Sequence, residues 1–484
     1  MKKHWFLVLF LTILATRLRL YRLDTPLADW HSFRQADTAS VTREFVKHNY
    51  PIWEPHFQDH SNIASGLDNP DGYRMVEFPL VNYLIAGAIR LQPQLNLVTT
   101  SRLFSIGFSI LGLVSLYGFV YLLSKRRALA FLSGLIFAAL PYSVFYSRVI
   151  LPEPAMLGTQ LASLWLFLLW LQQPSKNKSK SYLIYLLSLL SFAVSLLLKP
   201  TAIFIVPVFI VLGITHLGIR AFFSPWLISY AIIGIAPLVG WRNWIKEFPE
   251  GIPASDWLLN GNGIRLRPAW WRWLFAERIA KLILGYWGTS LFFTGLISRI
   301  KTNYKHPSLF DWITITWVGS MFAYLVVFAT GNVQHDYYQV PLIPIISILM
   351  ARGIIWMTES FSTRKFILWP SLITIIGLTF FMSWWEIRGY YDIQHPNIVT
   401  AGQRIDELTT PDARIIAPYQ GDTAFLFQTN RTGWPIGFEI EDKISKGANY
   451  YVSVNYDDET NQLMEEYEII EQTADYVIIK LSNI

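Results

Sequence analysis

Residues 29–45 read DWHSFRQADTASVTREF and carry two aspartates, a histidine, two arginines and a glutamate, directly after an apolar run that begins near the first residue. Ionisable side chains at membrane depth are costly and usually functional. A loop of more than about 15 residues is also uncommon unless it has a function. This stretch is therefore either a solvated surface helix or an amphipathic helix that carries charged groups to a site beside a membrane.

The composition places most of the chain in a membrane. Hydrophobic residues make up 52% of the 484 positions and charged residues 15%, below the roughly 25% usual in soluble domains. A membrane-spanning helix needs about 20 apolar residues. Because such runs keep recurring, we expect the first to be a retained anchor rather than a cleaved signal. The runs are 4–23, 101–123, 128–147, 153–171, 182–198, 200–218, 222–241, 281–298, 311–330, 336–351 and 366–385.

The basic residues between the runs predict a topology. If each run crosses once, the clusters at 2–3, 125–127, 176–180, 220, 299–305, 352 and 364–365 all fall on one side. The positive-inside rule makes that side cytoplasmic. The loop 24–77, the Trp-rich loop 242–280 and the tail are then external. The apolar segment 78–92 is short, and we expect it to be re-entrant or to lie on the membrane surface.

The tail differs from the rest of the chain. From Thr400 onward, 15 acidic residues face 6 basic ones, a net charge of −9, whereas the whole chain carries +6. The basic excess therefore belongs to the membrane part and is not the footprint of a nucleic-acid partner. Amphipathic helical patterns alternate with β-branched runs, which predicts a small external α/β domain at 396–484 with a short, mostly parallel sheet. The membrane domain is then 1–390.

Three further external turns place polar groups at the ends of apolar runs. They contain Arg148 with Glu153, Lys199 before Pro200, and His335 with Tyr338. Carboxylates together with cations and aromatics suit transfer from a lipid-anchored phosphate donor. A carboxylate takes the proton of an acceptor hydroxyl, and cations stabilise the charge of the departing phosphate.

The stretch His31-Ser-Phe-Arg34-Gln35-Ala-Asp37-Thr-Ala resembles the H-x-W-R-Q-A-D-T-A signature of bacterial GT-C membrane glycosyltransferases. These are related to protein O-mannosyltransferases and to the transferase that adds aminoarabinose to lipid A (glycosyltransferase families 39 and 83). The motif Glu77-Phe-Pro-Leu and the three turns above resemble later landmarks of the same superfamily. The resemblance covers essentially the whole chain.

The resemblance implies a polytopic all-α membrane domain of about 11–13 transmembrane helices with the GT-C fold. It also implies inverting transfer of a sugar from a polyprenyl-phosphate carrier to a lipid, glycan or protein acceptor outside the bacterial inner membrane. The aspartate-glutamate pair of better-known relatives falls near His31-Ser32, so the base is Asp37, which we prefer, or Asp29. Glu153 is a second acidic group. The residues implied in donor phosphate or substrate binding are His31, Arg34, Gln35, Glu77, Arg148, Lys199, His335 and Tyr338.

No cofactor and no metal site is predicted. The chain has no cysteine, which excludes disulfides and thiolate ligands. His56 and His60 have the i, i+4 spacing of a helical ligand pair, but scattered surface histidines explain them as well. Two alternatives to a transferase are a flippase for lipid-linked sugars, in which the charged turns line a transport pathway, and a non-catalytic membrane scaffold.

Overall fold

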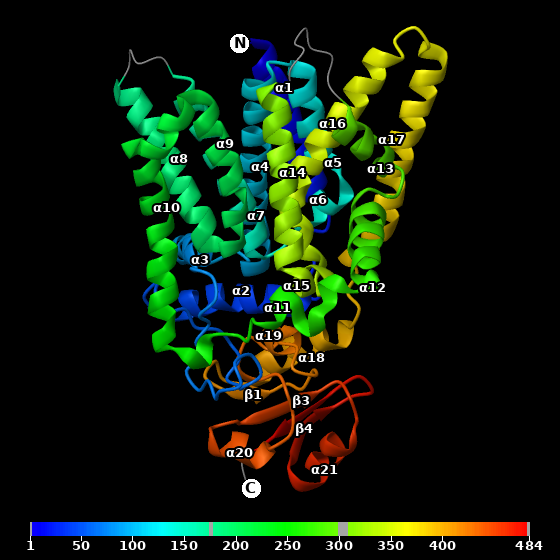
Figure 1. Ribbon diagram of the computed structural model, residues 1–484. Helices are drawn as coiled ribbons and strands as arrows, with labels where there is room; N and C mark the ends of the chain where they lie inside the picture. The colour runs from blue at the N-terminus through cyan, green and yellow to red at the C-terminus, as the bar shows by residue number, and fades with distance from the viewer. Residues whose placement is uncertain (1, 174–177, 299–307, 482–484) are drawn as a thin grey trace. The chain divides into compact units, whose positions relative to one another are not determined.

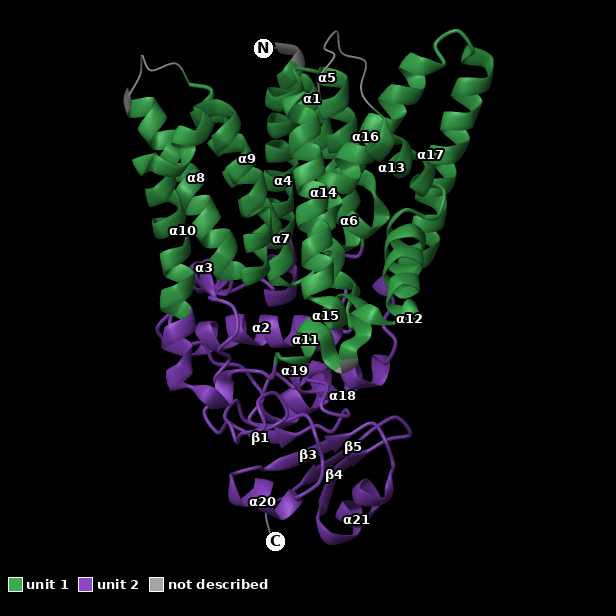
Figure 2. Cartoon of the chain, in the orientation of Figure 1, with its two compact units in different colours: residues 1–21, 105–241, 255–389 green, residues 22–104, 242–254, 390–484 purple. Residues whose placement is uncertain are grey.

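The computed structural model describes residues 2–173, 178–298 and 308–481. These form two compact units, shown in different colours in Figure 2. Unit 1 comprises 1–21, 105–241 and 255–389, and unit 2 comprises 22–104, 242–254 and 390–484. The predicted domain boundary between 390 and 396 stays a prediction. Contacts group the first loop and the tail in a single unit, although about 300 residues separate them in the sequence.

Unit 1 is built from apolar helices (Figure 1). Each of the predicted apolar runs forms helix, but several runs are broken. The run 128–147 is interrupted at Leu140, before Pro141, because proline disfavours a helical conformation at the preceding residue. The helices are α1 (Lys2–Arg19), α4 (Leu97–Ser124), α5 (Arg127–Ala139), α6 (Pro141–Tyr146), α7 (Pro152–Leu171), α8 (Lys178–Leu198), α9 (Val206–Leu217), α10 (Pro225–Trp244), α11 (Trp257–Asn260), α12 (Pro268–Trp271), α13 (Gly288–Ile297), α14 (Leu309–Val327), α15 (Ala329–Gln334), α16 (Ile343–Ser360) and α17 (Lys365–Ile387).

Shorter helical segments connect several of these helices. They are the 3₁₀ segments η1 (Pro200–Ile205), η2 (Gly218–Phe223), η5 (Gly261–Leu266), η7 (Asp336–Leu342) and η8 (Arg388–Tyr391), and the π-helix η6 (Arg272–Ile283). The last residues of α10 and of η8, and the first residues of α4, belong to unit 2.

Within the described residues, seven helical segments are long and apolar enough to cross a membrane. An eighth is present if the pair Pro268–Ile283 and Gly288–Ile297, bent by 113°, is one span. The chain is therefore an integral membrane protein. The other runs form shorter, bent or less apolar helices, so the exact number of crossings stays a prediction. The segment 78–92 forms α3 (Leu80–Leu91), which at 12 residues is too short to span about 30 Å.

Two of the predicted basic clusters lie at one end of unit 1. Figure 1 shows the N-terminal end of α1 and the connection between α16 and α17 at the same end of this unit. The basic pairs Lys2-Lys3 and Arg364-Lys365 lie at these two places. The predicted clusters at 299–305 and at 176–177 lie outside the described residues. Which end faces the cytoplasm stays a prediction.

Glycine allows two pairs of helices in unit 1 to approach closely. A Cβ atom on Gly353 of α16 would lie 2.2 Å from the Leu291 carbonyl oxygen of α13. A Cβ atom on Gly158 of α7 would lie 2.3 Å from the Phe108 carbonyl oxygen of α4. Close approach gives membrane helices van der Waals contacts. These contacts drive their association, because lipid tails are as apolar as the helices and the hydrophobic effect does not act between them.

Gly353→Ala is expected to destabilise the protein by about 1–3 kcal/mol, since the added methyl group must push two helix backbones apart. Gly377→Ala in α17 is the matched control, because a Cβ atom there meets nothing within 4 Å. The measurement is the free energy of unfolding of both variants in one detergent. Equal stability of the two variants would contradict the close crossing.

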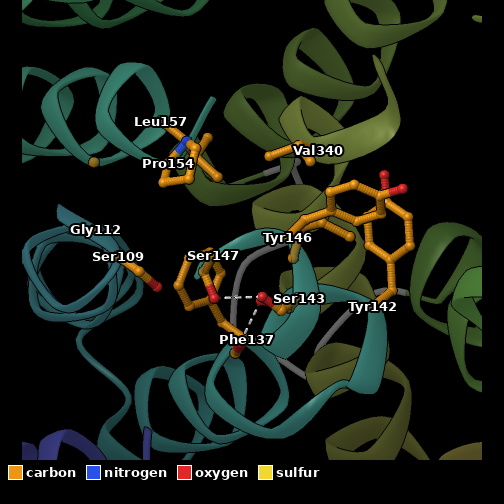
Figure 3. Close-up of a pocket in the computed structure, with 12 residues that line it drawn as sticks. Ser109, Gly112, Phe137, Tyr142, Ser143, Tyr146, Ser147, Pro154, Leu157 and Val340 are labelled. Atoms are coloured by element: carbon orange, nitrogen blue, oxygen red, sulfur yellow. Dashed lines mark hydrogen bonds between the residues drawn. The ribbon is translucent and has the colours of Figure 1, made fainter. Parts of the chain in front are cut away.

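A small cavity lies among α4, α6, α7 and α16 (Figure 3). Its volume is about 20 Å³, which holds about one water molecule. Beside it, Ser143 donates a hydrogen bond to the Phe137 carbonyl oxygen at 2.7 Å, and the Ser147 hydroxyl donates to the Ser143 carbonyl oxygen. The cavity is thus a packing void with satisfied hydroxyl groups, too small for a substrate.

Unit 2 contains a five-stranded sheet of order β2-β1-β3-β5-β4. The strands are β1 (Arg414–Ile416), β2 (Thr432–Trp434), β3 (Tyr450–Ser453), β4 (Glu468–Gln472) and β5 (Val477–Lys480). The β1 strand pairs in parallel with β2 and β3, and β5 pairs antiparallel with β3 and β4. The predicted α/β tail is confirmed, but the expectation of a mostly parallel sheet is wrong. Only four residues separate β4 from β5, and a connection this short requires an antiparallel pair.

Alternate residues of the strands point to opposite faces of the sheet, and helices cover both faces. Ile415, Val452 and Ile478 pack with residues of α18 (Pro396–Leu408) and α19 (Ala424–Gln428). Ile416, Tyr451, Val477 and Ile479 pack with Leu463 of α21 (Asp458–Glu466), and Ile440 of α20 (Ile440–Ser445) packs against the same cluster. The tail is therefore a three-layer α/β structure around two apolar cores.

Candidate active site

The motif of residues 31–39 lies at the start of α2 (Ser32–Lys47) in unit 2. The predicted helix is confirmed. The alternative of a solvated surface helix is wrong, because Asp37, Arg43 and Glu44 are all buried, at 8%, 6% and 4% exposure. Buried charges must be paired. Their partners identify the rest of the site.

Asp37 is held by two groups from distant parts of unit 2. Arg74 Nη2 donates to Asp37 Oδ2 at 2.7 Å, and the Thr423 hydroxyl donates to Asp37 Oδ1 at 2.6 Å. Arg74 also lies 5.0 Å from the Phe57 ring centroid. Each carboxylate oxygen has two lone pairs, so each retains one acceptor position. The carboxylate is therefore oriented but not saturated.

Asp29 is held more tightly than Asp37. Gln35 Nε2 donates to Asp29 Oδ1 at 2.8 Å, and Arg102 Nη2 donates to Asp29 Oδ2 at 3.2 Å. The side chains of Asp29 and Arg102 are both 0% exposed, whereas that of Asp37 is 11% exposed. Arg102 Nη1 also donates to the carbonyl oxygens of Leu23 and Thr25. Asp29 thus fixes the chain that leads into α2.

Arg34 and Glu77, two of the residues predicted to bind the donor phosphate or substrate, form an ion pair in unit 2. Arg34 Nη2 lies 2.6 Å from Glu77 Oε1 and 2.8 Å from Oε2. Both side chains are less than one-fifth exposed. The acidic motif at 77–80 is therefore connected to the signature helix by an ion pair.

Two carboxyl groups close to Asp37 have raised pKa values. Burial raises the pKa of Asp59 to about 6, and the negative charge of Asp37 makes a smaller contribution in the same direction. The same two causes raise the pKa of Asp422 to about 6. Burial of several carboxyl groups around Arg74 makes the charged form of each less favourable.

Asp59→Asn provides a test of this electrostatic arrangement. In the unfolded chain the carboxyl group titrates near 3.8, and in the native protein near 6. The native state therefore binds the proton more tightly, so the stability of the wild type falls as the pH rises through this window. Asparagine keeps an acceptor oxygen for the Ser61 N–H, which lies 2.8 Å from Asp59 Oδ1. The variant should equal the wild type below about pH 3 and be more stable by about 2–3 kcal/mol above about pH 7.

The measurement is the free energy of unfolding of both proteins as a function of pH. His60, whose pKa burial lowers to about 4, is present in both proteins, so its contribution cancels in the difference. The exposed Asp68, which pairs with Lys446 at the surface, is the control, and Asp68→Asn should give no pH-dependent gain. A gain for Asp59→Asn that does not change with pH would contradict the assignment.

A second group of predicted residues lies in unit 1. Lys199 forms an ion pair with Glu153 Oε1, and its ammonium group lies 4.6 Å from the Tyr338 ring centroid and 5.2 Å from that of Tyr337. Glu153 is 1% exposed, and within the described residues its Oε2 atom has no hydrogen-bond partner. A buried acceptor of this kind costs roughly 1–3 kcal/mol until a ligand or water satisfies it.

His335 and Arg148 are the other two predicted residues of unit 1. The His335 ring stacks on Tyr337 at 5.3 Å and meets Trp257 edge to face at 5.7 Å. Arg148 is fully buried, with its guanidinium 5.7 Å from the Phe145 ring centroid. The turn 335–338 therefore places Tyr338 beside Lys199, and His335 stacks on the neighbouring Tyr337.

Sequence reasoning missed Asp336 and its partners. Asp336 is 0% exposed. Its carboxylate accepts a hydrogen bond from the Tyr146 hydroxyl and lies 3.5 Å from Arg278, and its carbonyl oxygen accepts from the Tyr142 hydroxyl. The signal in the sequence was an aspartate inside an apolar run, between His335 and Tyr337. Its partners, however, lie 58 and 190 positions away.

The predicted residues thus fall into two groups. Asp29, His31, Arg34, Gln35, Asp37 and Glu77 belong to unit 2, and Arg148, Glu153, Lys199, His335 and Tyr338 belong to unit 1. That all of them meet in one pocket stays a prediction. The described residues contain no group of three or more His, Asp or Glu side chains placed to hold a metal. His56 Nδ1 donates to the Asp71 carbonyl oxygen at 2.7 Å, and the His56 ring stacks on Tyr50.

The comparisons with known proteins concern the fold and the family. The family of dolichyl-phosphate-mannose-protein mannosyltransferases matches residues 72–294. The crystal structure of ArnT from Cupriavidus metallidurans bound to undecaprenyl phosphate is similar with a TM-score of 0.68 and 12% sequence identity, over 98% of this chain and 97% of that one. This chain has a GT-C fold. The predicted resemblance of the chain to GT-C glycosyltransferases is confirmed at the level of the fold.

Two further structures extend this comparison. Apo ArnT from the same organism is similar with a TM-score of 0.67 and 13% identity, over 99% of this chain and 98% of that one. An oligosaccharyltransferase from Archaeoglobus fulgidus, in complex with Zn and sulfate, is similar with a TM-score of 0.57 and 10% identity, over 92% of this chain and 67% of that one. A search of curated protein sequences gives no match. At these identities the structures establish the fold alone.

Proposed function

We propose that this protein is a glycosyltransferase that moves a sugar from a polyprenyl-phosphate carrier to an acceptor hydroxyl on the external side of a bacterial inner membrane. The observation that carries the proposal is the agreement of the fold, over 98% of the chain, with an enzyme bound to undecaprenyl phosphate. The match to the mannosyltransferase family over residues 72–294 supports the same class of reaction.

The proposed reaction is a single displacement. The acceptor hydroxyl oxygen forms a bond to the anomeric carbon from the face opposite the phosphate, and the bond between that carbon and the phosphate oxygen breaks. The hydroxyl proton passes to a carboxylate, and the polyprenyl phosphate leaves with the bonding electron pair. Attack from the opposite face inverts the anomeric configuration. No cofactor enters this scheme.

The contacts in unit 1 support roles for Lys199 and Glu153. An ammonium group held between a carboxylate and two aromatic rings is a fixed point charge for a phosphate oxygen. Glu153 retains one buried oxygen without a hydrogen-bond partner among the described residues, and that oxygen is placed to accept from a substrate hydroxyl. Arg148, His335 and Tyr338 remain proposed donor contacts.

The contacts in unit 2 support Asp37 as the base. A base must touch the acceptor hydroxyl, and the Asp37 side chain keeps 11% of its surface exposed whereas that of Asp29 is 0% exposed. The hydrogen bonds from Arg74 and Thr423 fix the direction of the Asp37 carboxylate. Pre-orientation of this kind is a large part of what an enzyme contributes to proton transfer.

Asp37→Asn is expected to lower the rate of sugar release by about 10²–10⁴-fold, because the amide cannot accept the proton. The assay follows labelled sugar released from a panel of polyprenyl-phosphate sugars by the purified full-length protein. Asp29→Asn is the matched variant. Any activity that it loses should come with a lower free energy of unfolding, because the substitution removes the charge that pairs with the buried Arg102. Full activity of both variants would end the assignment of a loop-one base.

Single cysteines in this cysteine-free chain test the proposed orientation. Ser445→Cys lies on the exposed surface of the tail, and Thr363→Cys lies on the exposed connection between α16 and α17. In intact cells from which the outer membrane has been made permeable, an impermeant thiol reagent should label Ser445→Cys and leave Thr363→Cys unlabelled until the inner membrane is opened. The reverse pattern would invert the topology.

A further inference from the structure

Unit 2 contains a second feature that the proposed catalytic residues do not explain, a cavity of about 230 Å³. This volume equals about eight water molecules at roughly 30 Å³ each. The cavity lies between the chain leading into α2 and the tail. Its lining residues are Ala28, Asp29, Trp30, His31, Ser32, Phe33, Gln394, His395, Ile398, Tyr419 and Asp422.

The charge of the lining does not favour a phosphate ligand. Among the described residues, the cavity is lined by no lysine or arginine, whereas two aspartates, Asp29 and Asp422, line it. Phosphate sites in proteins are built from cations and backbone N–H groups. The Asp29 carboxylate is already occupied by Gln35 and Arg102. Asp422 therefore supplies the carboxylate that is available to a ligand, and an uncharged donor of hydrogen bonds fits it best.

The remaining lining combines flat apolar surfaces with polar edges. Trp30 stacks on Tyr390 at 4.7 Å with an interplanar angle of 21°, which holds its ring in place. Tyr419 meets the His395 ring edge to face at 5.8 Å and the Phe425 ring at 6.4 Å. Rings fixed in this way offer a face to C–H groups, while His395, Gln394 and Asp422 offer partners to hydroxyl groups. Sugars present both kinds of group.

The backbone of His31 supports a binding role for this cavity. His31 has φ 57° and ψ 35°, a left-handed conformation. Outside glycine this conformation costs roughly 1–2 kcal/mol per residue, and such residues cluster at functional sites. The Arg34 and Gln35 N–H groups both donate to the His31 carbonyl oxygen, at 3.1 and 3.2 Å, so the turn is held by the start of α2. This turn places His31 among the lining residues of the cavity.

We infer that this cavity binds an uncharged sugar ring of the acceptor, with its hydroxyl groups hydrogen-bonded to Asp422 and His31 and its apolar face on the Tyr419 ring. The assignment of this sugar to the acceptor rests on the proposed function. The binding of a neutral sugar does not, because it follows from the volume of the cavity, its aromatic rings and the lack of lysine and arginine among its described lining residues.

The test uses purified full-length protein and saturation-transfer NMR with methyl α-mannoside, methyl β-glucoside and methyl β-galactoside as probes. At least one probe should bind the wild type with a dissociation constant of about 1–10 mM. Asp422→Asn keeps an acceptor for the Ala424 N–H, 2.7 Å from Asp422 Oδ1, and should weaken binding about tenfold, or about 1.4 kcal/mol. Gln394→Trp, at the exposed rim, should abolish binding by filling the cavity.

Asp475→Asn and Thr400→Trp are matched controls on exposed surface of unit 2 outside the cavity, and both should bind as the wild type does. Inorganic phosphate should not displace the probe. Absence of binding by all three glycosides, or equal binding by Gln394→Trp and the wild type, would overturn the inference. Failure of the proposed function is a separate result, namely no sugar released from any polyprenyl-phosphate donor by the wild type.

Discussion

Unit 2 depends on the pairing of the charged residues that α2 buries. Arg43 donates to Gln58 Oε1 at 2.5 Å and to the Phe427 carbonyl oxygen at 2.9 Å, and Asp37 accepts from Thr423. An unpaired buried charge costs several kcal/mol. The first loop and the tail must therefore fold together, because each supplies the partners of the other. The isolated bridge between Asp59 and Gly433 of β2 adds a backbone connection between the same segments.

Unit 1 satisfies the same requirement in apolar surroundings. Lys199 pairs with Glu153, Arg278 with Asp336, and Arg352 with Asp311. Ionisable groups among apolar helices are tolerated when they pair with one another or with backbone carbonyls. Asp311 lies in the first turn of α14 and Arg352 lies within α16, so their ion pair links these two helices. Of the three carboxylates in these pairs, that of Glu153 has an oxygen buried without a hydrogen-bond partner among the described residues.

Much of the fold was predictable because its signals are local. Apolar runs of membrane length, prolines at their ends and the alternation in the tail each depend on a few neighbouring residues. The sheet was only partly predicted. The antiparallel pairing of β5 with β4 follows from the short connection between them. The composition of the strands reveals neither this pairing nor the strand order. The candidate site residues in the signature were named from the sequence. Their hydrogen-bonding partners Arg74, Arg102 and Thr423 were not. Nothing in their neighbourhoods distinguishes them from ordinary polar residues.

The sequence by itself determined that the chain is a helical membrane protein with an acidic α/β tail and a charged signature helix after its first apolar run. The tertiary structure decided which charges are paired, and with what. It distinguished the two candidate bases by their exposure. The Asp29 side chain, paired with Arg102, is completely buried, whereas the Asp37 side chain, held by Arg74 and Thr423, stays partly exposed. The physical reason is that hydropathy and periodicity act between near neighbours, whereas an ion pair needs two groups that only the folded chain brings within about 3 Å.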